Sequence, residues 1–323
     1  MKTGARLVLG KDDEGRRLDR VLRIALGDLP LSAIHRALRK GDIRVDGTKR
    51  DPAARCKTGE TVEISGMLLG SGENKPEAPR PAESPASSPA FSILLETADL
   101  VIVDKPIGML AHDGPDSLEA RVRRYLAPSL APSLSFAPGP LHRLDRNTSG
   151  VIAFSKSIDG ARAFSEALRE RRIAKTYLAL LEGRLESAAA WDDLLSRDGG
   201  RRQTRVSADE SGGQASKARE ALTEATPLAF SNGFTLASIS LGTGRTHQIR
   251  AQASAHGHPL AGDRKYGGRS CGQPYYLHAW RLSTSEIGLA GLPPFVEAPI
   301  PYYFIEKIRE IFPAGEIEVY WGL

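Results

Sequence analysis

The sequence of 323 residues contains only two cysteines, Cys56 and Cys271. Two thiols cannot form a disulfide framework, and these two form no CxxC pair for zinc or redox chemistry. No stretch approaches ~18 uncharged apolar residues, so we expect no transmembrane helix. The N-terminal segment lacks the apolar core that is typical of a signal peptide. These absences predict a reduced, cytoplasmic protein that does not enter a membrane.

Motifs for nucleotide cofactors and metals are also missing. The sequence has no G-x-x-x-x-G-K-[ST] loop, and no G-x-G-x-x-G follows a strand-like run. Six potential metal ligands do fall within one stretch, namely His247, His256, His258, Asp263, Cys271 and His278. Their spacings match neither H-E-x-x-H nor a paired Cys/His pattern. We therefore expect no metal site and no cofactor.

Positive charge is concentrated near the N-terminus. The whole chain carries a formal charge of +5 and has an isoelectric point near 9.2. Residues 16–50 alone hold ten Lys and Arg against four Asp, which leaves the rest of the chain near neutral. A local positive patch favours phosphate binding through counterion release, although a solvated charged face is an equally good explanation.

A segment rich in proline, serine and alanine divides the chain in two. Residues 67–90 show no hydrophobic periodicity, and their five prolines remove backbone donors. Such a composition is typical of a semi-extended linker. We therefore predict a small basic domain at 10–66, a linker at 67–90 and a large domain at 91–323.

The small domain combines two short helices with a hairpin. Apolar residues at helical spacing predict a helix that ends at Gly27 and a second that is capped by Ser32 and stops at Gly41. Strands follow at 43–45 and 61–64. This pattern resembles the S4 RNA-binding domain, a small α/β fold, over about fifty residues, and the resemblance implies contacts to RNA phosphates. The implied contact residues are Arg20, Arg36, Arg39, Lys40 and Arg44.

The large domain shows more strands than helices. Strand-like runs cover 100–103, 151–154, 176–181 and 234–241, and helical patterns cover 159–172 and 246–256. Because the strands do not alternate regularly with helices, a doubly wound parallel sheet is disfavoured. We predict an α+β fold with a mixed, mainly antiparallel sheet.

Three polar clusters in this domain could carry chemistry. The first is a loop around Asp145, where neighbouring arginines favour an ionised carboxylate. The second opens a strand with Tyr177, and the third places His247 and Arg250 three residues apart at a helix start. Each residue also has a structural explanation. Asp145 could cap a turn, Tyr177 could pack in the core, and Arg250 could bind a helix end or a surface carboxylate.

Taken together, the clusters resemble the RluA family of pseudouridine synthases. The matching sequences, in family order, are HRLDRNTSG (142–150), KTY (175–177), GRTHQIR (244–250), HGHPLAGDRKYG (256–267) and YYLHAWRL (275–282). The resemblance spans nearly all of 91–305. It implies the pseudouridine synthase fold and an isomerisation of uridine in RNA that needs no cofactor.

The resemblance also implies roles for individual residues. Asp145 matches the reacting carboxylate, which attacks the base, attacks C1′ or abstracts a proton. Arg250 matches its ion-pair partner, and Tyr177 matches the tyrosine that stacks on the base. The implied substrate-binding residues are His142, Arg143, Arg146, Arg245, His247 and Leu277.

An S4-like domain before such a catalytic domain is typical of family members that modify large-subunit ribosomal RNA. We therefore expect the partner to be RNA, with 23S rRNA or a ribosomal precursor favoured, and a monomeric protein. Two alternatives remain at this point. The same chemistry could act on tRNA, or the chain could be a non-catalytic RNA-binding factor in ribosome assembly.

Overall fold

A computed structural model describes residues 4–27, 29–66, 68, 91–130, 133–198, 203–207 and 218–313. The predicted linker at 67–90 therefore lies outside the described residues, apart from residue 68. The described residues group into two compact units. The first comprises those before residue 90 together with 121–139 and 156–158, and the second comprises the remainder.

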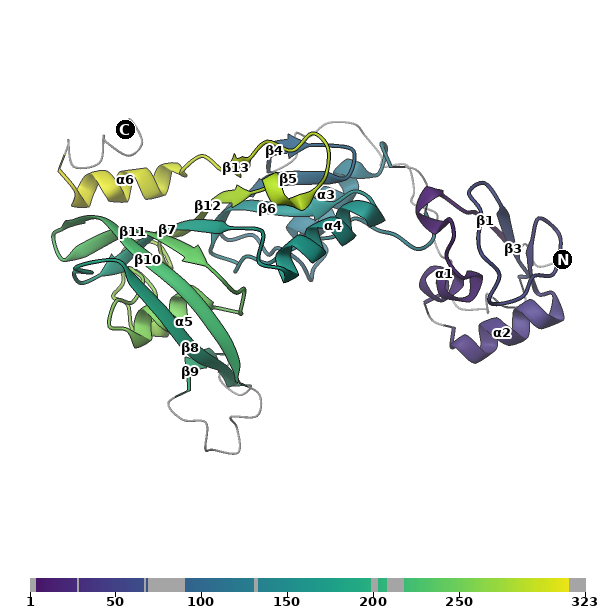
Figure 1. Cartoon of the computed structure of the whole chain (residues 1–323), viewed down its shortest axis with the longest axis horizontal. Helices are drawn as coiled ribbons and strands as arrows, with labels where there is room; N and C mark the ends of the chain where they lie inside the picture. Colours follow the sequence, from purple (N-terminus) through teal and green to yellow (C-terminus); the bar gives the residue numbers. More distant parts are fainter. Residues whose placement is uncertain are drawn as a thin grey trace. The chain divides into compact units, whose positions relative to one another are not determined.

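The first unit pairs a small antiparallel sheet with two helices (Figure 1). Its elements are β1 (Ala5–Val8), α1 (Leu18–Ala25), α2 (Leu31–Lys40), β2 (Ile43–Val45) and β3 (Thr61–Ile64), with strand order β1-β3-β2. Both helices bury the apolar residues that the spacing had identified, among them Leu22 and Ile34. Strand β1 begins before residue 10, where the sequence had placed the start of the small domain.

The ends of the two helices differ in how well the sequence predicted them. Gly41 adopts a left-handed conformation (φ 85°) and ends α2, as predicted. The prediction that Ser32 caps α2 was wrong, because the helix already begins at Leu31 and its N-cap is Pro30. A proline there has the fixed φ that suits a helix start, so no side-chain cap is required. Helix α1 ends at Ala25, two residues before Gly27.

A buried carboxylate ties a later segment of the chain into the first unit. Asp13 is fully buried and accepts hydrogen bonds from the backbone N–H groups of Leu134 (3.0 Å) and Ser135 (2.9 Å). Arg16 adds a bond to the Ser135 hydroxyl (2.7 Å). Buried carboxylates need such donors, so these bonds hold the 133–135 segment in place.

The second unit contains a long sheet of mixed but mainly antiparallel pairing (Figure 1). Its strands are β4 (Ser92–Glu96), β5 (Leu100–Lys105), β6 (Ser149–Ser155), β7 (Lys175–Glu182), β8 (Ala189–Asp198), β9 (Gln203–Val206), β10 (Arg219–Ser231), β11 (Phe234–Leu241), β12 (Leu277–Ser283) and β13 (Phe295–Glu297). The order is β4-β5-β6-β12-β7-β11-β10-β8-β9, with β13 beside β12. Only the β6–β12 pair is parallel among the described strands. The predicted α+β class is confirmed.

Helices cover this sheet through apolar side chains. Two of them are α4 (Ile158–Arg169) and α6 (Tyr302–Ile311), and α5 (Gln248–Ala255) contacts β8, β9 and β10. The remaining helix, α3 (Leu118–Leu126), belongs to the first unit from residue 121 onward. Phe164 of α4 packs in a cluster with Ile102 and Val151, and Phe304 of α6 packs in one with Leu178 and Leu180. Side chains alternate along a strand. The residues of β7 that flank Leu178 and Leu180 therefore face the side of the sheet opposite α6.

Two predicted helices have different ends in the structure. Helix α4 stops at Arg169, and Arg171 then takes a left-handed conformation (φ 58°). Helix α5 begins at Gln248 rather than Thr246. The Gln248 side-chain oxygen accepts bonds from the Thr243 hydroxyl (2.8 Å) and the Arg245 N–H (2.9 Å), so 243–246 forms a closed turn before the helix.

Candidate active site

The three predicted clusters line a single cavity in the second unit. Its volume is about 990 Å³. The predicted residues that line it are His142, Arg143, Asp145, Tyr177, Arg245, His247, Arg250 and Leu277. They come from the loop before β6, from the start of β7 and β12, and from the turn into α5. Residues far apart in the sequence therefore share one site.

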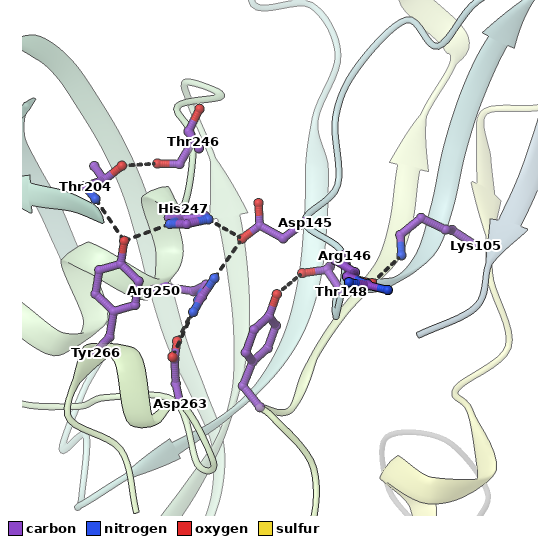
Figure 2. A network of polar contacts seen from close by, with 11 residues as sticks. Lys105, Asp145, Arg146, Thr148, Thr204, Thr246, His247, Arg250, Asp263 and Tyr266 are labelled. Atoms are coloured by element: carbon purple, nitrogen blue, oxygen red, sulfur yellow. Dashed lines mark hydrogen bonds and ion pairs between the residues drawn. The ribbon is translucent and has the colours of Figure 1, made fainter. Parts of the chain in front are cut away.

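Asp145 and Arg250 form an ion pair inside this cavity (Figure 2). Nη1 of Arg250 lies 3.3 Å from Oδ2 of Asp145. The side chain of Asp145 is 24% exposed, whereas that of Arg250 is 9% exposed. The carboxylate can thus be reached from the cavity while its cationic partner is held within the protein. The sequence had offered the adjacent Arg143 and Arg146 as cations beside Asp145, and the family resemblance had implied Arg250. In the structure Arg250 forms the ion pair, and His247 is the other group that contacts the carboxylate.

A second carboxylate binds the other edge of the same guanidinium. Asp263 is buried, and its oxygens accept bonds from Nε (2.6 Å) and Nη2 (2.9 Å) of Arg250. Burial lowers the pKa of Arg250, but the Asp263 bonds and the nearby charges outweigh this and raise that pKa above its usual value. Arg250 is therefore a permanent cation in the site.

His247 approaches the same oxygen of Asp145. Its Nε2 lies 3.7 Å from Oδ2, and its backbone adopts a left-handed conformation (φ 55°) at the start of α5. Burial lowers the pKa of His247, which favours a neutral ring. Left-handed backbone is rare for a residue with a side chain and persists only where the surroundings hold it.

Tyr177 lies on the face of β7 that lines the cavity. It is buried, and burial together with the charge of Asp145 raises the pKa of its hydroxyl, which stays protonated at neutral pH. Tyr275 is also buried, its ring lies 4.4 Å from the Arg250 guanidinium carbon, and its hydroxyl contacts that of Thr148 (3.3 Å). Tyr275 thus packs on the cation of the ion pair, while Tyr177 lines the cavity, where an aromatic ring suits stacking of a planar base.

A buried lysine braces the loop that carries Asp145. Lys105 is fully buried, and its Nζ donates to the carbonyls of Pro106 (3.0 Å), Met109 (2.9 Å) and Arg146 (2.9 Å). Burial lowers the pKa of Lys105 to about 7. Three carbonyl acceptors use all three N–H bonds of an ammonium group, so these contacts favour the charged form.

His142 stays neutral within the cavity wall. Its Nε2 accepts a bond from the Ala153 N–H (3.1 Å), so the ring proton is on Nδ1. Burial lowers the pKa of His142 to about 3, and its ring stacks on Phe164 at 5.9 Å. This position suits packing and orientation rather than acid–base chemistry.

The remaining predicted residues occupy the rim or lie outside it. Arg143 is exposed and lines the cavity, and Leu277 is buried in its wall. Arg245 is half-buried, and its Nε donates to the Glu220 carbonyl (2.9 Å). Arg146 is not among the lining residues, because its side chain turns to the Gly108 carbonyl (2.9 Å). Its sequence position beside Asp145 gave no sign of this.

Sequence reasoning missed several residues of the site. Lys175 is a buried residue of the cavity lining, and the exposed Arg169 and Arg171 also line the cavity. Asp263 and Tyr266 fall within the motif HGHPLAGDRKYG, yet Asp263 was weighed only as a metal ligand. No group of three or more His, Cys, Asp or Glu side chains within the described ranges is arranged to hold a metal ion.

The five predicted RNA-contact residues of the first unit are all on its surface. They are Arg20, Arg36, Arg39, Lys40 and Arg44, and each is exposed. Arg36, Arg39 and Lys40 are three and four residues apart on α2, so they share one face of that helix. In the part of the chain that the structure describes, no helix has the length and apolar character needed to cross a membrane.

The comparisons with known proteins agree on one family. Residues 99–255 match the family model described as RNA pseudouridylate synthase. The chain is 33% identical over 310 residues to ribosomal large subunit pseudouridine synthase C of Salmonella typhi, covering 91% of this chain and 92% of that protein. It is 36% identical over 262 residues to the protein of the same name from Escherichia coli K12, covering 80% and 78%.

Solved structures show the same fold. Human RNA pseudouridylate synthase domain containing 4 matches with a TM-score of 0.56 and 23% identity, over 67% of this chain and 91% of that one. The fold and the carboxylate-bearing cavity define an RNA-modifying isomerase. The chain belongs to the RNA pseudouridylate synthase family, and within it to the RluA type that its motifs resemble.

Proposed function

We propose that this protein converts specific uridines of large-subunit ribosomal RNA to pseudouridine, with Asp145 as the reacting carboxylate. One observation carries the assignment of the site. Asp145 is a partly exposed carboxylate that is paired with Arg250 inside a cavity of about 990 Å³ lined by arginines and by Tyr177. The names of the relatives support ribosomal RNA as the substrate.

The reaction rearranges bonds without adding or removing atoms. The C1′–N1 bond breaks, the uracil turns, and a C1′–C5 bond forms, while the proton on C5 is lost and N1 gains one. Asp145 acts at the junction of sugar and base. Arg250 keeps it ionised and oriented, since an adjacent cation favours the charged carboxylate.

The target uridine must leave its helical stack to reach Asp145. This costs a few kcal/mol, which stacking and phosphate contacts offset. Tyr177 supplies the stacking surface. Arg143 and Arg245 on the rim bind the flanking backbone, and His247 contacts the base or its neighbours. His142 orients the cavity wall that receives the base, and Leu277 closes that wall. Arg146 has the smaller part of bracing the loop through Gly108.

The two units have different proposed roles, one in binding RNA and the other in catalysis. We propose that 10–66 forms an S4-like RNA-binding domain, that 67–90 is a linker, and that 91–323 forms the catalytic domain. The exposed cations of the first unit bind phosphates and raise the effective concentration of RNA at the cavity. The protein is proposed to act as a monomer, and its two unpaired thiols suit the reducing cytoplasm.

Tritium release from rRNA that carries 5-tritiated uridine tests the activity directly. The Asp145→Asn variant keeps the shape of the side chain and removes its charge, so it should release no tritium while binding RNA as the wild type does. Asp159→Asn is the matched control, because that side chain is 78% exposed at the start of α4. Turnover by Asp145→Asn near the wild-type rate would refute the assignment.

The substrate itself is tested in the cell. Pseudouridines are mapped in ribosomal and transfer RNA from strains with and without the gene. Loss of sites in large-subunit rRNA alone supports the proposal. Loss confined to tRNA identifies the alternative substrate, and no loss in either RNA favours a non-catalytic assembly factor.

A further inference from the structure

Arg250 and His247, the two groups that contact Asp145, are both hydrogen-bonded to side chains of one short turn. This turn runs from Gly262 to Gly268 and contains the short 3-10 helix Arg264–Tyr266. Asp263 binds Arg250, and Tyr266 binds His247 (Figure 2). We refer to this segment as the 262–268 turn. The assigned reaction has given neither Asp263 nor Tyr266 a role.

Asp263 fixes the orientation of Arg250. Its two oxygens occupy Nε and Nη2 of the guanidinium, which leaves Nη1 to face Asp145 at 3.3 Å. A bidentate pair of this kind sets the plane of the guanidinium as well as its position. The ring of Tyr266 lies 4.8 Å from the guanidinium carbon, a cation–π distance that supports the same placement.

Tyr266 fixes the proton of His247. The Tyr266 hydroxyl accepts a bond from the Thr204 N–H (3.0 Å), and we assign its own proton to the bond with Nδ1 of His247 (2.8 Å). The ring proton of His247 then lies on Nε2, the atom that is 3.7 Å from Oδ2 of Asp145. A tyrosine on the turn therefore makes His247 a donor toward the carboxylate.

The turn is itself tightly constrained by two glycines. A Cβ on Gly262 would overlap the carbonyl of Gln273, and the backbone there has a φ of +92°. A Cβ on Gly268 would overlap the carbonyl of Leu260 and lie 2.9 Å from the Asp263 nitrogen. Chain segments pack so closely at both ends that Asp263 and Tyr266 have little freedom to shift.

We propose that Asp263 and Tyr266 are positioning residues for the isomerisation. Through Arg250 and His247 they direct two donors to Oδ2 of Asp145 and leave Oδ1 for the substrate. This proposal rests on the proposed function of the site. Figure 2 shows both contacts converging on one oxygen of Asp145, with the other turned away from them.

The charge balance gives Asp263 a second effect. Asp145 and Asp263 share one guanidinium, so the three groups together carry a net charge of −1 when His247 is neutral. If the charge of Asp263 is removed, Arg250 is released to pair with both oxygens of Asp145. The carboxylate would then be neutralised and covered at the atom that the substrate must reach.

The experiment measures single-turnover rates and RNA binding for the full chain on an rRNA transcript. Asp263→Asn should lower the rate about 10- to 100-fold, the range expected when a catalytic group is misplaced. Its affinity for RNA should remain that of the wild type. Arg264→Gln is the matched control, because it removes one charge from an exposed side chain of the same turn. A wild-type rate for Asp263→Asn overturns the proposal.

A double-mutant cycle separates positioning from general support of the fold. If Asp263 acts through Arg250, then Asp263→Asn costs nothing further in an Arg250→Lys background. A structural role would instead lower the rate by the same factor in both backgrounds, and that additive result overturns the proposal.

Tyr266→Phe keeps the test decisive if Asp263→Asn fails to fold. It removes only the hydroxyl, so the rate should fall about tenfold while RNA affinity is kept. The control is Tyr276→Phe, whose buried hydroxyl donates to the Cys271 carbonyl (2.8 Å) away from the cavity and should leave the rate unchanged. Equal rates for Tyr266→Phe and wild type overturn the role of Tyr266.

The outcome is distinguishable from failure of the proposed function. If Asp145→Asn is inactive while Asp263→Asn and Tyr266→Phe turn over normally, the function stands and the positioning proposal falls. If Asp145→Asn remains active, the assignment of the reacting carboxylate fails, whatever the variants of the turn do.

Discussion

Arg250 meets Asp145 through a single nitrogen, while its other edge is occupied by Asp263. A lysine carries the same charge but lacks the planar fork that binds two carboxylates at once. We expect Arg250→Lys to lower turnover by about 100-fold with little change in RNA affinity. The check is single-turnover tritium release beside a binding assay. Arg309→Lys, on the exposed face of α6, is the control, and comparable rates for the two variants would contradict the prediction.

Gly150 marks the point where the only parallel pair of the described sheet comes into close contact. A Cβ there would overlap the carbonyl of Ala279, and its φ is +110°. Gly150→Ala should therefore lower the free energy of unfolding by several kcal/mol, as strain and overlap add. Urea unfolding measures the loss.

Gly233→Ala supplies the control for that experiment. Gly233 also has a positive φ (+79°), but nothing lies within 4 Å of a Cβ built on it. It should cost only about 1–2 kcal/mol, the usual penalty of left-handed backbone. Equal losses at the two glycines would mean that contact with Ala279 contributes nothing.

Buried histidines predict how stability depends on pH. Burial lowers the pKa of His278 to about 4 and that of His142 to about 3, from an ordinary value near 6.5 in the unfolded chain. Between pH 6.5 and 4 the unfolded chain binds protons that the folded one does not. Stability is therefore fully present above pH ~6.5 and falls by up to ~1.4 kcal/mol per pH unit for each histidine as the pH drops.

The variant that tests this is His278→Gln. Its Nδ1 contacts the Ser149 hydroxyl (2.9 Å), so the variant lowers stability at every pH, but it should also flatten the slope between pH 6.5 and 4. Urea unfolding at several pH values measures that slope. A slope equal to that of the wild type would show that His278 does not contribute to it.

The basic face of the first unit predicts a dependence on salt. The variant that tests this prediction combines five substitutions, namely Arg20→Gln, Arg36→Gln, Arg39→Gln, Lys40→Gln and Arg44→Gln. Each phosphate contact adds about 0.7–0.9 to the slope of log affinity against log salt, so losing all five should flatten it by up to about 4. Binding assays over a salt series measure this. An unchanged slope would put the phosphate contacts on the second unit instead.

Because Lys105 braces the loop that carries Asp145, we predict that its substitution lowers activity. Lys105→Met keeps the length of the side chain but leaves the carbonyls of Pro106, Met109 and Arg146 without their donor. Buried carbonyls without a partner cost about 1–3 kcal/mol each, so the loop should loosen. We expect lower turnover and a lower melting temperature, both measured beside Lys57→Met, which changes an exposed lysine of the first unit.

Local patterns in the sequence were sufficient for much of the secondary structure. The run 234–241 coincides with β11, and 43–45 and 61–64 coincide with β2 and β3. Alternation and helical spacing depend on near neighbours, so they are readable without the fold. Helix starts were less predictable, because α5 begins where the side chain of Gln248 closes a turn.

The sequence by itself determined the family, the α+β class and the three clusters of the site, because motif order and apolar periodicity are properties of the chain alone. The resemblance had also implied Arg250 as the ion-pair partner of Asp145, and the two side chains lie 3.3 Å apart. Only the tertiary structure decided that the second group beside Asp145 is His247, and that the adjacent Arg143 and Arg146 form no ion pair with it. The structure also decided that Asp263 and Tyr266 support Arg250 and His247. Sheet pairing and the close packing around Gly262 and Gly268 bring these segments together, and no local pattern encodes such distances.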